Sequence, residues 1–167
     1  MLTFVLGGAR SGKSRHAEAL VEALPPPWVY VATAQAGDAE MRERIAHHRQ
    51  RRRAGWRTVE APRDLVTALA DIPDGQPALV DCLTLWLTNL LLADADLSAE
   101  TARLVGALAR PRGPWFVVAN EVGLGIVPDN ALARRFRDEA GRLNQAVAAV
   151  AGRVLFMAAG LPLQLKG

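Results

Sequence analysis

The sequence predicts an α/β fold in which helices cover both faces of a mostly parallel sheet. Two observations lead to this class. Short apolar segments recur along the 167 residues without alternating with polar residues, and longer segments of helical pattern separate them. Strands buried on both faces of a parallel sheet have this continuous apolar character, and helices supply the crossovers between them. The length suits one domain over residues 1–167.

Five apolar segments predict the strands of this sheet. The first ends in two glycines, and the second, WVYVATA, is rich in the β-branched and aromatic residues that strands favour. The third begins at Ala78 and runs into a helical pattern. In chain order the expected strands cover residues 2–8, 28–34, 78–86, 115–121 and 153–160.

Segments rich in helix formers lie between the expected strands. The first stops at Pro25 and the third at Pro73, because proline cannot continue a helix. Ser98 is placed to cap the helix that it begins. The expected helices cover residues 14–24, 38–53, 64–72, 85–93, 98–110 and 129–151.

Composition excludes several classes of protein. Half of the residues are hydrophobic and 22% are charged, as in globular rather than disordered chains. A single cysteine, Cys82, rules out an intramolecular disulfide and disfavours a cysteine-based metal site. No apolar run reaches the length of a membrane span, and the first is too short for a signal peptide, so we expect a cytoplasmic protein. The net charge of +3 suits an anionic ligand or a nucleic acid.

The segment GGARSGKS follows the first expected strand and begins the first expected helix. It matches the pattern of a phosphate-binding loop, in which backbone amides and a helix N-terminus surround an anion. Lys13 can bridge the terminal phosphates and Ser14 can bind Mg²⁺. A glycine-rich turn with a chance lysine is the alternative. The expected nucleotide contacts here are Gly7, Gly8, Ala9, Arg10, Ser11, Gly12, Lys13 and Ser14.

Acidic residues follow two of the expected strands. Asp81 comes directly after Ala-Leu-Val, where an acid can hold the magnesium together with Ser14, although it could instead cap the following turn. Glu121 ends the strand 115–121. It is either a contact to substrate or metal or a loop acid satisfied by nearby backbone, and the sequence does not separate the two.

The segment MRERIAHHRQRRR, residues 41–53, contains two adjacent histidines among arginines. On a helical wheel His48 shares a face with Met41 and Ile45, whereas His47 lies on the polar face. A neutral imidazole can attack phosphorus, and arginines can bind phosphate oxygens. Spacing alone nevertheless favours an ordinary solvated, arginine-rich helix face.

Several of these segments together resemble one known family, the bifunctional adenosylcobinamide kinase/adenosylcobinamide-phosphate guanylyltransferases of cobalamin biosynthesis. The phosphate loop alone would be weak evidence, because many families share it. The resemblance extends nearly end to end and rests on GGARSGKSRHAE (7–18), VYVATAQ (29–35), RIAHHR (44–49), WRTVEAP (56–62), DCLTLWLTNLL (81–91), NEVGLGIVPDNALARRFRDEAGRLNQ (120–145) and the C-terminal LPLQLK.

The resemblance implies a RecA-like P-loop NTPase domain with two activities. ATP or GTP phosphorylates the aminopropanol hydroxyl of adenosylcobinamide. GMP then passes from GTP through a covalent intermediate on His47 to that phosphate, giving adenosylcobinamide-GDP. Mg²⁺ is the implied cofactor, Lys13 is a second catalytic residue, and members can form trimers. The further nucleotide contacts implied are Val31, Ala32, Thr33, His48, Arg49, Gln50, Arg51, Glu60 and Asp81.

The expected helix 129–151 carries apolar residues at helical spacing, which predicts a core-facing stripe. This stripe consists of Leu132, Phe136, Ala140, Leu143 and Val147. Arg134, Arg135 and Arg137 lie elsewhere on the helix. They either serve the corrinoid phosphate or a subunit contact, or form a solvated face, which is the simpler interpretation.

Two other functions compete with the bifunctional enzyme. A plain small-molecule P-loop kinase would leave no nucleotide attached to His47. An ATPase module or RNA-binding P-loop protein would use the basic stretch 42–57 and bind nucleic acid in a salt-dependent way. Aromatic residues make up only 5% of the chain and none interrupts this stretch before Trp56, which disfavours nucleic-acid stacking.

Overall fold

The computed structural model describes residues 1–35 and 53–167. The helix expected over 38–53, with both of its histidines, therefore lies almost entirely outside the described residues. No described helix combines the length and the apolar character needed to cross a bilayer.

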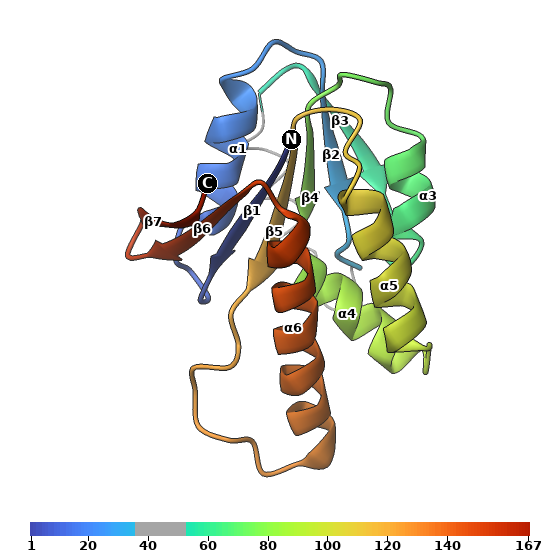
Figure 1. Ribbon diagram of the computed structural model, residues 1–167, viewed down its shortest axis with the longest axis vertical. Helices are drawn as coiled ribbons and strands as arrows, with labels where there is room; N and C mark the ends of the chain where they lie inside the picture. The colour runs from blue at the N-terminus through green and yellow to red at the C-terminus, as the bar shows by residue number, and fades with distance from the viewer. Residues whose placement is uncertain (36–52) are drawn as a thin grey trace.

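Seven strands of the described chain form one sheet in the order β3-β2-β4-β5-β1-β6-β7 (Figure 1). All neighbouring strands pair in parallel except β6 and β7, which form an antiparallel hairpin. The predicted class, a mostly parallel sheet between helices, is confirmed. The strands are β1 (Leu2–Gly7), β2 (Trp28–Ala32), β3 (Trp56–Glu60), β4 (Ala78–Asp81), β5 (Trp115–Asn120), β6 (Arg153–Ala158) and β7 (Leu161–Lys166).

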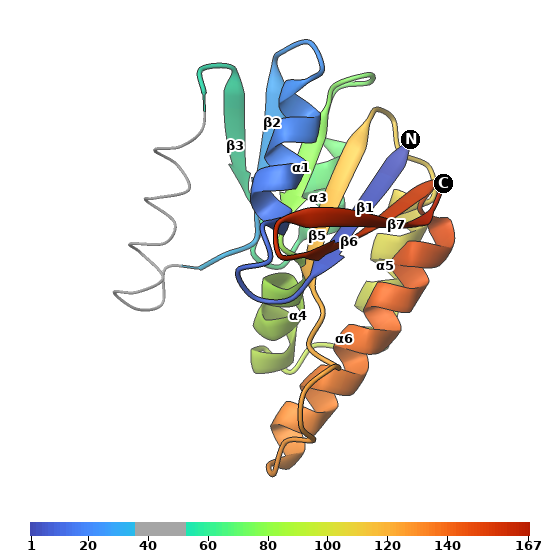
Figure 2. The same ribbon diagram turned by 90° about the vertical axis from the view of Figure 1, so that its left-hand side faces the viewer.

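Helices cover the sheet on both faces, and each face has its own apolar core. Ala17 and Val21 of α1 pack with Val5 and Leu155 on one face. Figure 2 shows α1 on one side of the strands and α5 and α6 on the other. The larger core on the second face takes side chains from α3, α4, α5 and α6. The described helices are α1 (Lys13–Glu22), α3 (Leu65–Ala70), α4 (Leu83–Leu92), α5 (Leu97–Leu108) and α6 (Ala131–Val150).

Two strands, β3 and β7, were missing from the sequence prediction. Both lie at edges of the sheet, where one side has no neighbouring strand and burial is low. Three of the five β3 residues and all six β7 residues are exposed, so neither forms the buried apolar run on which the prediction relied. Pro162 lies within β7, because an edge strand tolerates proline.

The N-terminal turns of α6 depart from the expected core packing. Ala140, Leu143 and Val147 are buried and Phe136 packs against the core, as the helical spacing predicted. Leu132 is 55% exposed, because the start of α6 extends beyond the end of the sheet (Figure 1). The prediction for Leu132 was wrong because helical periodicity does not reveal where a helix outruns its sheet.

Helix α5 begins earlier than the sequence suggested. The side chain of Asp96, not Ser98, caps it by accepting a hydrogen bond from the Ala99 amide at 3.0 Å. Asn130 caps α6 in the same way through the Ala133 amide at 2.7 Å. Such caps satisfy amides at a helix start that have no partner within the helix.

Leu104 and Leu92 form a matched pair that tests the assignment of the core. Leu104 of α5 is fully buried, whereas Leu92 at the end of α4 is 73% exposed. We expect Leu104→Ala to lower the free energy of unfolding by about 2–5 kcal/mol, because a cavity remains in the core. Leu92→Ala should change it by less than about 0.5 kcal/mol. Urea unfolding followed by circular dichroism measures both, and equal effects would contradict the assignment.

Candidate active site

Polar residues gather at the carboxyl ends of the parallel strands. Gly7 ends β1 and begins the phosphate loop, Asp81 ends β4, and Glu121 follows β5. The Glu121 amide donates a hydrogen bond to the Gly7 carbonyl at 3.1 Å, so the ends of β1 and β5 are joined. In sheets of this kind ligands bind at the carboxyl ends of the strands. This edge is therefore the candidate active site.

The register places Glu60, Ala32 and Asp81 in one row across β3, β2 and β4. Side chains at paired positions point to the same face of a sheet. The row therefore lies on the α1 face, beside the helix that the phosphate loop begins. Two acids that are 21 residues apart in the sequence thus lie on either side of Ala32 in one row.

The phosphate loop owes its curvature to residues with unusual backbone angles. Arg10 and Gly12 have φ values of 56° and 91°, in the left-handed region. Gly7 provides space, because a Cβ there would lie 2.5 Å from Ser11 Oγ and 2.7 Å from the Met157 carbonyl oxygen. Helix α1 starts at Lys13, so its free N-terminal amides face the loop. This arrangement favours an anion.

A turn from the far end of the chain supports the loop. Ala159 and Gly160 join β6 to β7 with φ values of 50° and 80°, the conformation that two-residue hairpins favour. The Gly160 amide donates a hydrogen bond to the Ser11 carbonyl at 3.0 Å. A Cβ on Gly12 would lie 3.3 Å from Gly160 Cα, so the two backbones are close. This contact was not predicted from the sequence, although the dipeptide Ala-Gly between two apolar segments was a signal of a turn.

Lys13 and Ser14 are positioned at the start of α1. Lys13 is buried, and its Nζ donates a hydrogen bond to the Gly8 carbonyl at 2.9 Å, which places the ammonium group over the loop. Ser14 Oγ lies 3.4 Å from Asp81 Oδ1. The predicted lysine, serine and aspartate therefore meet in one place, although Asp81 is 67 residues from Ser14 in the sequence.

Ser14 and Asp81 fit a magnesium site by the chemistry of their donor atoms. Mg²⁺ prefers oxygen ligands, and in nucleotide sites it is held by one or two protein oxygens, water and phosphate. The Ser14 hydroxyl and Asp81 Oδ1 provide two adjacent oxygens beside the phosphate loop. The second carboxylate oxygen, Oδ2, accepts a hydrogen bond from the Tyr30 hydroxyl at 2.7 Å. No role for Tyr30 was predicted from the sequence.

Thr33 joins the ends of β2 and β4. Its buried hydroxyl donates to the Cys82 carbonyl and accepts from the Cys82 amide, both at 2.7 Å, and the peptide bond between Asp81 and Cys82 is cis. Asn89 of α4 donates to the carbonyls of Thr33 and Pro62, both at 2.8 Å. These bonds hold Thr33 and Pro62, just after β2 and β3, against α4. Asn89 was also missed, because nothing in its local sequence marks it.

Cys82 has the character of a buried structural thiol. Burial raises its pKa, and the negative charge of Asp81 raises it further. The thiol is therefore protonated at neutral pH, and the thiolate that nucleophilic chemistry requires is absent.

Glu121 and the arginines of α6 make local contacts. Glu121 Oε1 accepts a hydrogen bond from the Gly123 amide at 2.6 Å, which fits the interpretation as a loop acid satisfied by backbone. Arg134 donates to the carbonyls of Pro128 and Asp129 and so holds the loop before α6. Arg137 pairs with Asp138 at 3.2 Å, and Arg135 is exposed.

The remaining predicted nucleotide contacts differ in how exposed they are to solvent. Glu60 is exposed at the end of β3, whereas the side chains of Val31 and Thr33 are fully buried. The contacts stay predictions. His47, His48, Arg49, Gln50 and Arg51 lie outside the described residues.

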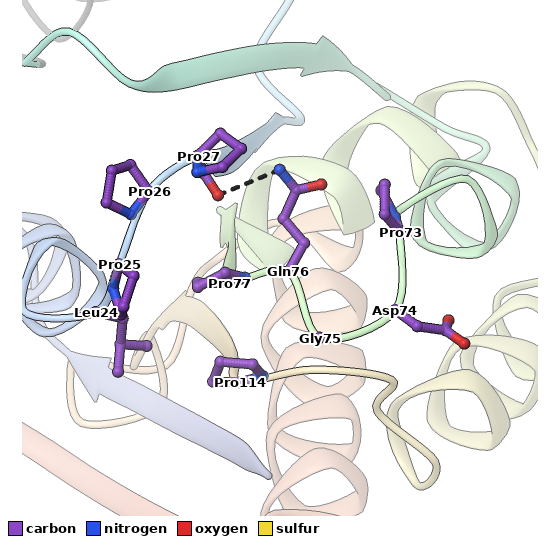
Figure 3. A pocket seen from close by; sticks show the side chains of 10 residues that line it. All are labelled: Leu24, Pro25, Pro26, Pro27, Pro73, Asp74, Gly75, Gln76, Pro77 and Pro114. Carbon is purple, nitrogen blue, oxygen red and sulfur yellow. Dashed lines mark hydrogen bonds between the residues drawn. The ribbon is translucent and has the colours of Figure 1, made fainter.

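A shallow pocket of about 560 Å³ lies at the opposite end of the sheet (Figure 3). Its walls are the loops that precede β2, β4 and β5, and prolines dominate the lining. The lining includes Pro25, Pro26, Pro27, Pro73, Pro77 and Pro114. Because ligands of parallel sheets bind at the carboxyl ends of strands, this pocket at their amino ends is not the nucleotide site.

The strand order, the phosphate loop and the acid at the end of β4 define a P-loop NTPase fold, and solved structures agree. A Pyrococcus horikoshii OT3 protein superposes with a TM-score of 0.54 at 10% identity, covering 99% of this chain and 86% of its own. An ATPase from the type III secretion system of pathogenic bacteria gives 0.52 at 11% identity, covering 98% of this chain and 56% of its own. At such identities the likeness concerns the fold alone.

Sequence comparison narrows the class to one family. Residues 3–165 match the family described as cobinamide kinase / cobinamide phosphate guanyltransferase, and the chain belongs to it. The bifunctional adenosylcobalamin biosynthesis protein CobP of Pseudomonas aeruginosa is 52% identical, over 100% of this chain and 98% of that protein. The corresponding CobU protein of Salmonella typhimurium is 43% identical, over 99% and 100%. The resemblance found in the sequence is thus confirmed.

Gly12→Ala tests whether the shape of the loop matters for anion binding. The new methyl group would be attached to a residue whose backbone has a left-handed φ, and it would contact the backbone of Gly160 closely. We expect a cost of about 1–3 kcal/mol in the strained backbone and at least about tenfold weaker binding of GTP. Isothermal titration calorimetry measures the binding.

Gly106→Ala is the matched control, because Gly106 lies inside α5 and a Cβ there meets no atom within 4 Å. This variant should bind GTP as the unaltered protein does and be slightly more stable, since alanine favours helices. Unchanged GTP binding by the Gly12 variant would contradict the assignment of the loop.

Proposed function

We propose that a single domain, residues 1–167, phosphorylates adenosylcobinamide and then transfers GMP to the product, giving adenosylcobinamide-GDP. The observation that carries this proposal is the convergence of Lys13, Ser14 and Asp81 at the phosphate loop, in a chain that matches the family over nearly its whole length. The relatives at 52% and 43% identity are named as bifunctional adenosylcobalamin biosynthesis proteins.

For the kinase step, the loop would hold the triphosphate of ATP or GTP. The substrate hydroxyl attacks the γ-phosphorus, the bond to the bridging oxygen breaks, and the nucleoside diphosphate leaves. The loop amides and the Lys13 ammonium would stabilise the charge on the phosphate oxygens. Ser14 and Asp81 would hold Mg²⁺, which supplies charge neutralisation on the phosphates when bound.

For the transferase step, His47 would act as the nucleophile. A nitrogen of its imidazole bonds to the α-phosphorus of GTP as the bond to the bridging oxygen breaks, and pyrophosphate leaves. The phosphate of adenosylcobinamide phosphate then displaces the imidazole and takes the GMP. A neutral imidazole is a competent nucleophile for this chemistry. The support is the family pattern, in which the first histidine of the pair at 47–48 carries the nucleotide.

The same pattern supports guanine nucleotide contacts from His48, Arg49, Gln50 and Arg51, from the end of β2 at Val31, Ala32 and Thr33, and from Glu60 and Asp81. Exposed Glu60 lies beside Ala32 in the sheet register, at the same edge as the phosphate loop. We also propose a cytoplasmic homo-oligomer, a trimer by the same resemblance, that acts on a corrinoid and not on nucleic acid.

His47→Ala tests the covalent intermediate. The protein is incubated with Mg²⁺ and GTP labelled at the α-phosphate, and the isolated protein is assayed for label that is labile to acid and stable to base. We expect label on the unaltered protein and none on the variant, because alanine removes the nucleophile. An absence of label on folded, GTP-binding protein would leave a plain P-loop kinase as the function.

His16→Gln is the control that this experiment needs. His16 lies on α1 near the phosphate loop, where burial, and to a smaller extent the charge of Arg153, lower the pKa of its imidazole. It is therefore neutral at pH 7 and also has the form that attacks phosphorus. The His16 variant should keep the label. Label lost from it and kept by the His47 variant would contradict the assignment.

A further inference from the structure

The side chain of Tyr30 reaches the acid of the candidate metal site from a neighbouring strand. In the register of β2 and β4, Tyr30 pairs with Leu79 and Ala32 pairs with Asp81. Tyr30 and Asp81 are thus diagonal neighbours on the face that α1 covers, a separation that an aromatic side chain can bridge. The sheet itself brings the hydroxyl to the carboxylate.

Packing fixes the ring of Tyr30. The residue is 5% exposed and belongs to the apolar core beneath α1. The edge of its ring meets Trp56 with centroids 6.0 Å apart and an interplanar angle of 81°. Trp56 is held in turn by the hydrogen bond from its Nε1 to Glu22 Oε1 at 2.9 Å. A ring clamped in this way has little freedom, so the position of its hydroxyl is fixed.

The hydroxyl contacts one particular oxygen of Asp81. It donates a hydrogen bond to Oδ2 at 2.7 Å, the short distance typical of a hydroxyl bound to a charged carboxylate. The other oxygen, Oδ1, faces Ser14 Oγ. The carboxylate is therefore oriented with one oxygen bound to Tyr30 and the other turned toward the phosphate loop.

We propose that Tyr30 is a positioning residue that makes Asp81 a one-oxygen ligand and so favours Mg²⁺ over Ca²⁺. Mg²⁺ requires near-octahedral geometry with single oxygens, whereas Ca²⁺ accepts both oxygens of a carboxylate at longer distances. The hydrogen bond to Oδ2 disfavours that two-oxygen mode. This inference rests on the proposed magnesium site at Ser14 and Asp81, and it adds the residue that selects the metal.

Tyr30→Phe tests the inference, because it removes the hydroxyl and keeps the ring. Binding of a non-hydrolysable GTP analogue is measured by calorimetry in EDTA, in Mg²⁺ and in Ca²⁺. We expect unchanged affinity in EDTA. Mg²⁺ should strengthen binding by roughly tenfold less than in the unaltered protein, because one hydrogen bond to a charged group is lost. The preference for Mg²⁺ over Ca²⁺ should fall, and the melting temperature in EDTA should stay near that of the unaltered protein.

Two further variants separate the possible failures. Trp115→Phe alters a buried aromatic residue in the core on the other face of the sheet, away from Tyr30 and Asp81, and it should respond to both metals as the unaltered protein does. Asp81→Asn should lose most of the strengthening by Mg²⁺. If the Asp81 variant behaves so and the Tyr30 variant matches the unaltered protein, the Tyr30 inference is overturned and the metal site stands.

The proposed metal site itself fails if Mg²⁺ does not strengthen GTP-analogue binding by the unaltered protein. It also fails if Mg²⁺ strengthens binding by the Asp81→Asn variant to the same extent. If Tyr30→Phe weakens binding in EDTA as much as in Mg²⁺, Tyr30 has a structural role only, and the inference is again overturned.

Discussion

The backbone of residues 7–14 must turn its amide groups toward one point, and the rest of the site follows from how that curvature is held. An isolated loop with left-handed residues at Arg10 and Gly12 would be costly to form. Here β1 anchors its start, α1 continues from its end, and the β6–β7 turn donates a hydrogen bond to Ser11 from the side. The loop after β1 and the β6–β7 turn thus meet at the phosphate-binding loop, which explains why an exposed hairpin late in the chain belongs to the site.

A second constraint concerns the end of β4. Asp81 is useful to a nucleotide site only if its carboxylate faces Ser14. Two side chains, Tyr30 in β2 and Thr33 just after it, hold Asp81 and the backbone that follows it. Tyr30 binds the outer oxygen of the carboxylate, and Thr33 binds the backbone on both sides of Cys82. The aromatic residues on this face therefore do more than fill the core, because their packing is transmitted to the acid.

The parts predicted from the sequence are those that local patterns encode. Continuous apolar segments gave the parallel sheet, and the glycine-lysine-serine pattern between a strand and a helix gave the phosphate loop with Lys13 and Ser14. The longer motifs along the chain, taken together, identified the family. Asp81 was found because an acid directly after a buried segment is conspicuous in any parallel sheet.

The parts that were missed depend on contacts between distant segments. Nothing near Tyr30, Asn89 or Gly160 in the sequence shows that they touch Asp81, Thr33 and Ser11. Edge strands such as β7 escape detection because they do not need apolar residues on both faces. The exposure of Leu132 depends on where α6 passes the end of the sheet, which periodicity alone cannot express.

The position of the metal and the triphosphate is the most direct test of this account. Crystals of the protein grown with a non-hydrolysable GTP analogue and Mn²⁺ in place of Mg²⁺ would show the metal by its anomalous scattering. The account predicts one peak beside Ser14 Oγ and Asp81 Oδ1, with the triphosphate inside the loop of residues 7–14. A nucleotide bound elsewhere, or a metal peak away from Asp81, would contradict it.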